Sequence, residues 1–104
     1  MMKTYRKDEL LNICPVCGYD KLFESPFDTY GYPSHEICPC CGFEFGFDDS
    51  NKNRTFEDFR KEWIENGFKF FSSERPPKKW NKEIMLKQLR NIEKVKHYKP
   101  YILK

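Results

Sequence analysis

The sequence lacks any long apolar run, and this absence limits the kinds of protein that it can encode. No stretch of about 18 apolar residues is present, so the sequence offers no transmembrane helix. The first twelve residues contain lysines and an arginine, but no apolar stretch of about 7 to 15 residues followed by a signal-peptide cleavage site. We therefore expect a cytoplasmic protein that does not bind membranes.

Motifs of the common catalytic sites are also missing. The chain has no Ser-His-Asp order, no glycine-rich phosphate loop and no redox C-x-x-C motif in a βαβ context. His35 and Glu36 are adjacent, whereas a zinc-deaminase signature has one residue between them. Residues 48–51 lack the register and the distal glutamate of a calcium-binding loop. We therefore expect no enzymatic activity.

Aliphatic residues are few, so aromatic residues must form most of the core. The chain contains ten Phe, six Tyr and two Trp among 104 residues, which is the length of one small domain spanning residues 1–104. A domain of this size buries a smaller share of its surface than a larger one does. A structural metal would therefore add substantially to its stability.

Two cysteine pairs have the spacing of a four-thiolate metal site. Cys14 and Cys17 form the first C-x2-C element, Cys38 and Cys41 form the second, and 20 residues separate the two elements. This pattern predicts one tetrahedral Zn²⁺ per chain, bound by these four cysteines. Iron in a rubredoxin-like site accepts the same ligands and remains an alternative. Cys40 lies between two ligands, and we expect its side chain to point away from the metal.

The pattern around the cysteines predicts a zinc ribbon over residues 5–49. Residues 19–25 and 35–38 flank a turn-rich stretch, which is typical of a hairpin between two metal-binding loops, hereafter knuckles. Phe43, Phe45 and Phe47 alternate with other residues, as on one face of a half-buried strand. The predicted fold class is small α+β: a rubredoxin-like zinc ribbon of short antiparallel strands, followed by two amphipathic helices.

The two helices are predicted over residues 55–66 and 81–96, with a basic tail that continues to residue 104. Thr55 is suited to cap the first helix, and Gly67 is suited to end it in a left-handed conformation. Spacing places Phe56, Phe59 and Trp63 on one face, with Arg60 among the charged residues on the opposite side. We expect Met85, Leu89 and Ile92 of the second helix to pack on this aromatic face, and Trp80 to join the second helix to the core.

Charge is distributed unevenly along the chain. Residues 1–74 contain nine Lys/Arg and 14 Asp/Glu, a net charge of −5, whereas residues 75–104 contain ten and two, a net charge of +8. The two parts sum to the net charge of +3. Lys87, Arg90 and Lys94 are candidate nucleic-acid-binding residues. The basic tail can instead offset the acidic part of the same molecule, which is the interpretation that we favour.

The sequence resembles a known bacterial family. Its first motif is Cys14-Pro15-Val16-Cys17-Gly18-Tyr19, its second is Ile37-Cys38-Pro39-Cys40-Cys41-Gly42-Phe43, and Arg60, Trp63, Gly67, Pro76-Pro77 and Trp80 follow. These motifs resemble those of the bacterial cysteine-rich CPCC-type small proteins over about residues 14 to 92. Similar proteins are sometimes found beside bacterial toxin genes, so the resemblance implies an immunity or interaction role.

Two classes of function follow from this sequence. As a protein-interaction module, the chain would use the acidic surface of Glu44, Asp48 and Asp49, or the aromatic residues Phe70 and Phe71, to bind a protein partner. As a nucleic-acid-binding zinc ribbon it would use its basic helix. We favour the interaction module, which includes a toxin immunity protein, and iron-based electron transfer is a third alternative.

Overall fold

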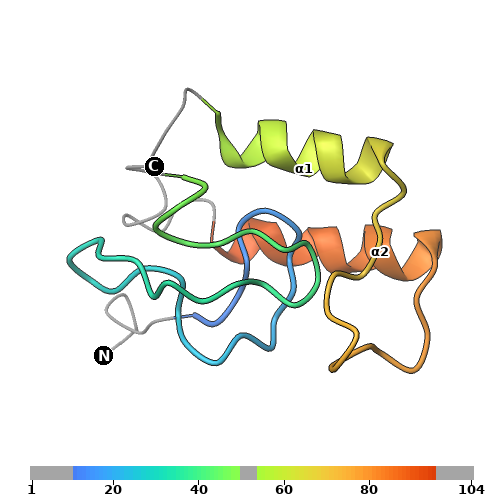
Figure 1. Cartoon of the computed structure of the whole chain (residues 1–104), viewed down its shortest axis with the longest axis horizontal. Helices are drawn as coiled ribbons and strands as arrows, with labels where there is room; N and C mark the ends of the chain where they lie inside the picture. Colours follow the sequence, from blue (N-terminus) through green and yellow to red (C-terminus); the bar gives the residue numbers. More distant parts are fainter. Residues whose placement is uncertain (1–10, 50–53, 96–104) are drawn as a thin grey trace.

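The computed structural model describes residues 11–49 and 54–95, and loops make up most of this part of the chain (Figure 1). Residues 11–49 form a looped segment that contains both cysteine pairs. Helix α1 follows at Phe56–Glu65, then helix α2 at Lys82–Leu89, which continues into the 3-10 helix η1 at Arg90–Lys94. None of the described helices is both long enough and apolar enough to cross a membrane.

The predicted zinc ribbon is wrong, because residues 11–49 contain no β-strand. Their only strand-like pairings are two isolated antiparallel bridges, Phe27 with Pro33 and Ile37 with Glu44. Phe43 and Phe45 are buried as expected, but the Phe47 side chain is 59% exposed. The alternation fails because Gly46 has a φ of +98°, which turns the chain after Phe45. Residues 5–10 of the predicted ribbon lie outside the described residues.

Carboxylates take over part of the hydrogen bonding that a sheet would provide. Backbone N–H groups left unpaired in the loops donate to acidic side chains within the same segment. These pairs are Tyr30 and Tyr32 with Asp28, Phe23 and Glu24 with Glu36, Glu44 with Asp48, and Gly46 with Asp49, at distances of 2.6–3.2 Å. The acidic side chains of this segment therefore stabilise its turns through local side-chain-to-backbone hydrogen bonds, at exposed as well as half-buried positions.

Both ends of α1 agree with the sequence prediction. Thr55 and Asp58 form a capping box: the Thr55 hydroxyl accepts from the Asp58 N–H at 3.0 Å, and the Asp58 carboxylate accepts from the Thr55 N–H at 3.1 Å. At the other end Gly67 has a φ of +102°. The Phe68 N–H then donates to the Trp63 carbonyl at 2.8 Å, which completes a Schellman motif.

The second helix begins where the sequence predicts but is a shorter α-helix than expected. The Asn81 side chain caps it by accepting from the Ile84 N–H at 2.9 Å, and the α-helix ends at Leu89. Residues 90–94 continue as a 3-10 helix, and residue 96, the predicted end, lies with the basic tail outside the described residues. Trp80 joins this helix to the core as predicted, since its ring centroid lies 5.5 Å from that of Phe70 and 6.3 Å from that of Trp63.

The backbones of α1 and α2 stay apart, although Trp63 of α1 and Met85 of α2 belong to the same hydrophobic core. Within the described chain, no Cα of α1 lies within 8 Å of a Cα of α2. The aromatic face of α1 packs instead on the second knuckle, where the Phe59 and Phe43 ring centroids are 4.8 Å apart in an edge-to-face contact. Met85 of α2 is buried in the shared core. The first knuckle binds both helices through side chains, so the cysteine loops connect the two helices.

Candidate metal centre

The two knuckles have nearly the same backbone geometry. In each, the glycine N–H donates to the carbonyl of the first cysteine, and the N–H of that cysteine donates to the carbonyl of the residue after the glycine. The bonds are Gly18 to Cys14 at 2.8 Å and Cys14 to Tyr19 at 2.8 Å, then Gly42 to Cys38 at 2.8 Å and Cys38 to Phe43 at 2.9 Å. Gly18 and Gly42 have φ values of +85° and +82°, a left-handed conformation that glycine adopts without steric cost. Each turn therefore directs both of its ligand cysteine side chains toward the same point.

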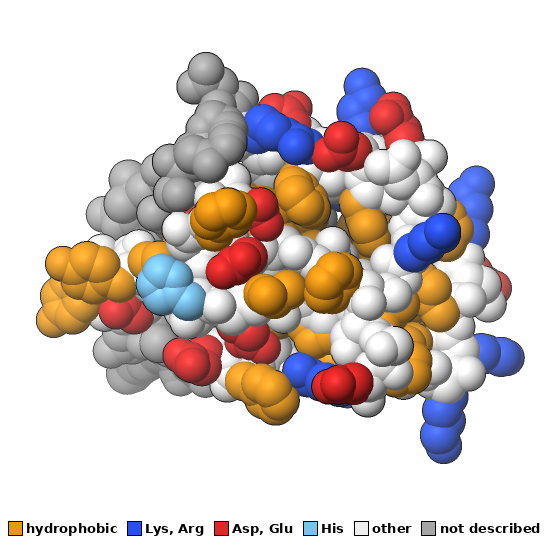
Figure 2. Space-filling view, viewed as in Figure 1, with side chains coloured by type: hydrophobic (Ala, Val, Ile, Leu, Met, Phe, Trp, Pro, Cys, Tyr) orange, Lys and Arg blue, Asp and Glu red, His pale blue; other side chains and the backbone are white. Residues whose placement is uncertain are grey.

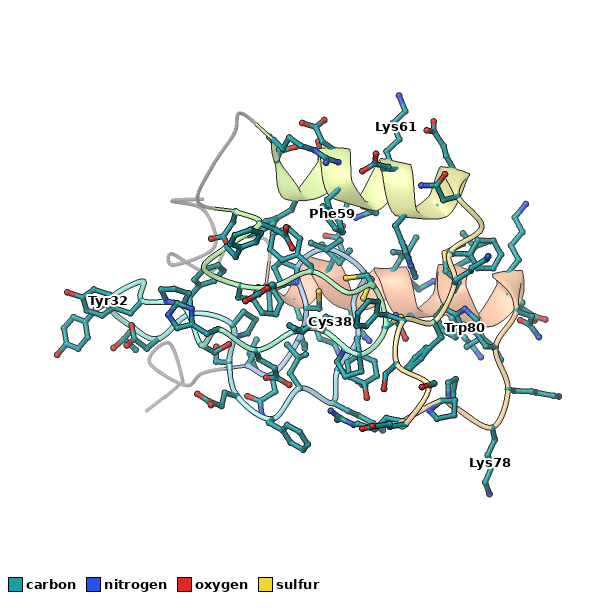
Figure 3. All side chains as sticks on the ribbon, in the orientation of Figure 1. Tyr32, Cys38, Phe59, Lys61, Lys78 and Trp80 are labelled. Carbon is teal, nitrogen blue, oxygen red and sulfur yellow. The ribbon has the colours of Figure 1, made fainter. Side chains whose placement is uncertain are left out.

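These turns bring the four predicted ligand cysteines together. The Sγ atoms of Cys14, Cys17, Cys38 and Cys41 all lie within 4.8 Å of one another, and all four residues are buried (Figure 3). Sγ–Sγ distances are 3.8 Å for Cys14 and Cys41 and 3.7 Å for Cys17 and Cys38. A tetrahedron with metal–sulfur bonds of about 2.3 Å has sulfur–sulfur edges of about 3.8 Å. The cluster therefore has the size and the donor atoms that a tetrahedral metal ion needs.

Arg60 of α1 holds the first knuckle. Its guanidinium donates from Nε to the Val16 carbonyl at 2.7 Å and from Nη2 to the Pro15 carbonyl at 3.0 Å. Pro15 and Val16 are both buried, so their carbonyl oxygens need a donor from within the protein. The prediction that Arg60 lies on the solvent side of the helix is therefore wrong. Arg60 lies four residues after Phe56 and three before Trp63, so helical spacing puts it on the same buried face as these two aromatic residues.

The equivalent carbonyls of the second knuckle are satisfied differently. The Ser72 N–H donates to the Pro39 carbonyl at 2.8 Å, and the Phe71 N–H donates to the Cys40 carbonyl at 2.9 Å. The segment between α1 and α2 therefore runs along the second knuckle, and the Phe71 ring covers Gly42. Backbone N–H groups of this segment therefore satisfy the carbonyls of the second knuckle, whereas the Arg60 side chain satisfies those of the first.

The end of α2 closes the centre from the other side. The Gln88 side chain donates to the Cys17 carbonyl at 3.0 Å, and the Asn91 side chain donates to the Gly18 carbonyl at 2.9 Å. The approach is close: a Cβ on Gly18 would lie 2.1 Å from the Gln88 carbonyl oxygen. Sequence reasoning did not identify Gln88 or Asn91, because nothing in the local pattern of a short helix marks a contact some 70 residues away in the chain.

Burial controls the ionisation of the four thiols when no metal is bound. Desolvation raises the pKa of Cys14, Cys17 and Cys41. Burial also opposes ionisation of Cys38, but hydrogen bonds from the other three thiols outweigh it and hold the pKa of Cys38 well below its usual value. A divalent cation that binds all four sulfurs would displace the protons that the thiols hold without it.

Cys40 lies beside the cluster but is not one of its four close sulfurs. Its side chain is fully buried, and its Sγ lies 3.3 Å from the Gln88 amide nitrogen. The Sγ of Cys41, the next residue, is the one that joins the cluster. The geometry therefore agrees with the predicted ligand register, in which Cys40 points away from the metal position.

The residues predicted to bind a protein partner occupy different environments. Glu44, Asp48 and Asp49 are half-buried at the turn after the second knuckle, where Asp48 and Asp49 accept backbone hydrogen bonds. Phe70 is partly buried against the core, with its ring in edge-to-face contact with Tyr19 and Trp80. Phe71 is 62% exposed. Phe71 is therefore the accessible member of the aromatic pair.

Basic and histidine candidates lie apart from the cysteines. Lys87, Arg90 and Lys94 are all exposed, the first on α2 and the other two on η1. His35 is exposed and has a φ of +67°, with its ring against Gly46. It therefore contributes to a turn rather than to the cysteine cluster, and His97 lies outside the described residues.

One segment of the surface is both acidic and rich in exposed apolar side chains. Residues 22–49, hereafter the acidic segment, contain six Asp/Glu and no Lys or Arg. Of seven large hydrophobic side chains that are exposed in the described chain, five belong to it: Phe23, Tyr30, Tyr32, Ile37 and Phe47. Figure 2 shows red and orange side chains mixed around the histidine, while most blue side chains lie toward the other end.

Comparisons with known proteins place the chain in a family. It is 30% identical to a Bacillus subtilis (strain 168) protein described as uncharacterized protein YozI, over 79% of this chain and 85% of that protein. The chain belongs to the YozI family. No family model matches the sequence, and no solved structure matches it. Membership of the CPCC-type proteins stays a prediction.

Proposed function

We propose that the protein binds one structural Zn²⁺ through Cys14, Cys17, Cys38 and Cys41 and has no enzymatic activity. The observation that carries this proposal is the buried sulfur cluster, with edges of 3.7 and 3.8 Å. Four thiolates complete a tetrahedron, so no coordination position is left for a catalytic water. The metal would join two loop segments that share no sheet, and the closed site favours stabilisation over catalysis. A reducing cytoplasm would keep the cysteines available to the metal.

Metal analysis of the purified protein tests the zinc site. We expect one zinc per chain and a colourless protein, since Zn²⁺ has a filled d shell. Stoichiometric iron and a red protein would favour the electron-transfer alternative, because iron accepts the same four thiolates. Absence of any stoichiometric metal, or two disulfides at these positions, would contradict the proposal.

The proposed role of the folded protein is to bind a protein partner through the acidic segment. Exposed aromatic side chains supply apolar contact area, and the excess of carboxylates attracts a partner segment with basic and apolar residues. An immunity protein that covers a basic surface of a toxin would have this chemistry. The resemblance to CPCC-type proteins supports that role.

Capture experiments with matched variants test the partner surface. Tagged protein from its native host should retain a basic partner at about 0.15 M salt and lose it as salt is raised. The double variant Ile37→Ser with Phe47→Ser should abolish capture, whereas Leu86→Ser should not, because Leu86 is 49% exposed but lies on α2. Equal capture by all three proteins would contradict the surface. Oligonucleotide binding that is lost when Lys87, Arg90 and Lys94 are neutralised would favour the nucleic-acid alternative.

A further inference from the structure

The four thiols of the metal centre are not equally accessible. Cys14, Cys17 and Cys38 have no exposed surface, whereas Cys41 is 8% exposed. Cys41 also lines an open pocket of about 210 Å³, together with Phe59, Glu62, Trp63, Asn66 and Lys69. This pocket lies where the C-terminal half of α1 and the residues after it meet the second knuckle. Cys41 is therefore the cluster cysteine that a small molecule can approach from solvent.

Cys40 would be the expected reactive thiol on chemical grounds alone, because it is the cysteine that the metal leaves free. However, its side chain has no exposed surface and contacts Gln88 inside the fold. Reaction with an oxidant needs both thiolate character and access. Cys40 lacks access, whereas a metal-bound Cys41 has both.

We propose that Cys41 is a modification site, at which peroxide oxidises the metal centre and releases the metal. This inference rests on the proposed zinc centre. In the first step the Cys41 thiolate attacks one oxygen of hydrogen peroxide, the O–O bond breaks, and Cys41 sulfenic acid and hydroxide form. The Cys14 thiolate, with its Sγ 3.8 Å from that of Cys41, then attacks the sulfenic sulfur and displaces a second hydroxide.

The product is a disulfide between the two knuckles, and the reaction balances. Two thiolates lose two electrons, one peroxide gains them, and the two hydroxides take protons from solvent. Two of the four zinc ligands are consumed, so the ion keeps only Cys17 and Cys38 and dissociates. A reductant that cleaves the disulfide would regenerate all four thiols, which makes the release reversible.

Limited oxidation followed by mapping tests the proposal. Protein first shown to contain one zinc per chain is treated with less than one equivalent of hydrogen peroxide. A chromophoric chelator reports zinc, and mass spectrometry of alkylated peptides locates the oxidised cysteines. We expect zinc release in step with loss of Cys14 and Cys41 thiols, while Cys40 stays reduced until the protein unfolds. A first product that contains Cys40, or a Cys17–Cys38 disulfide formed first, would overturn the proposal.

A pair of variants tests the route to the sulfur. Glu62→Ala removes a side chain that lines the pocket and should speed zinc release. Glu57→Ala removes the same charge from the same helix, but Glu57 does not line this pocket, so its release rate should match that of the unmodified protein. Equal rates for the two variants would show that the pocket is not the route. A protein that contains no zinc at the start would instead contradict the proposed function.

Discussion

Replacing Arg60 by methionine should destabilise the protein more than any other single charge removal on α1. Methionine keeps the apolar stem but removes the guanidinium that donates to the Pro15 and Val16 carbonyls at 3.0 and 2.7 Å. The matched control is Lys61→Met, which removes the same charge from the next residue of the helix. Lys61 is exposed and, in Figure 3, points away from the loops.

The size of the effect follows from the two lost bonds. A hydrogen bond to a charged group contributes about 1.5–3 kcal/mol. The two bonds share one guanidinium and water can reach a half-buried site, so their sum overestimates the loss. We expect Arg60→Met to cost about 3 kcal/mol, against about 0.5 kcal/mol or less for Lys61→Met. For a domain of this size, 3 kcal/mol lowers Tm by roughly 12–20 °C.

Thermal melts with the metal saturating and with the metal removed would measure this difference. The metal affinity of Arg60→Met should also fall, because the first knuckle loses the group that fixes its backbone. Arg60→Lys should recover part of the stability, since an ammonium supplies the charge but cannot donate in the same forked geometry. If Arg60→Met melts within 2 °C of Lys61→Met, roughly the error of such a comparison, the positioning role of Arg60 is refuted.

Three further predictions concern the cysteine loops. Cys14→Ser should lose the metal and much of the stability, whereas Cys40→Ser should keep the metal, as elemental analysis and melts would report. Gly18→Ala should prevent correct folding, because its Cβ would lie 2.1 Å from a backbone oxygen, while Gly31→Ala has open space and should cost only about 1–2 kcal/mol of strain in denaturant titrations. The pH dependence of stability should reverse on metal binding. Without metal, the raised pKa values of Cys14, Cys17 and Cys41 contribute stability below their ordinary value of 9.0 that is lost as pH rises above it, and the lowered pKa of Cys38 opposes them with a contribution that is lost as pH falls. With metal, acid displaces the ion and destabilises the fold.

Features that depend on residues close together in the chain could be predicted from the sequence. Turns at Gly18 and Gly42 need a residue that tolerates positive φ, and the cysteine spacing around them fixes which thiols face one point. Thr55 with Asp58, and Gly67, determine the two ends of α1 through contacts within one helical turn. Such contacts can be predicted because the interacting groups are only a few residues apart.

Features that depend on groups far apart in the chain could not be predicted without the folded structure. The alternation of Phe43, Phe45 and Phe47 suggested a strand, but a strand needs a neighbouring strand to pair with. Here the N–H groups of Glu44 and Gly46 donate to the carboxylates of Asp48 and Asp49 instead. Arg60 of α1 and Gln88 of α2 each donate to a carbonyl of the first knuckle, which therefore links two helices whose backbones stay apart. Access to the cluster through Cys41 likewise depends on how α1 lies over the second knuckle, a relation that no local spacing encodes.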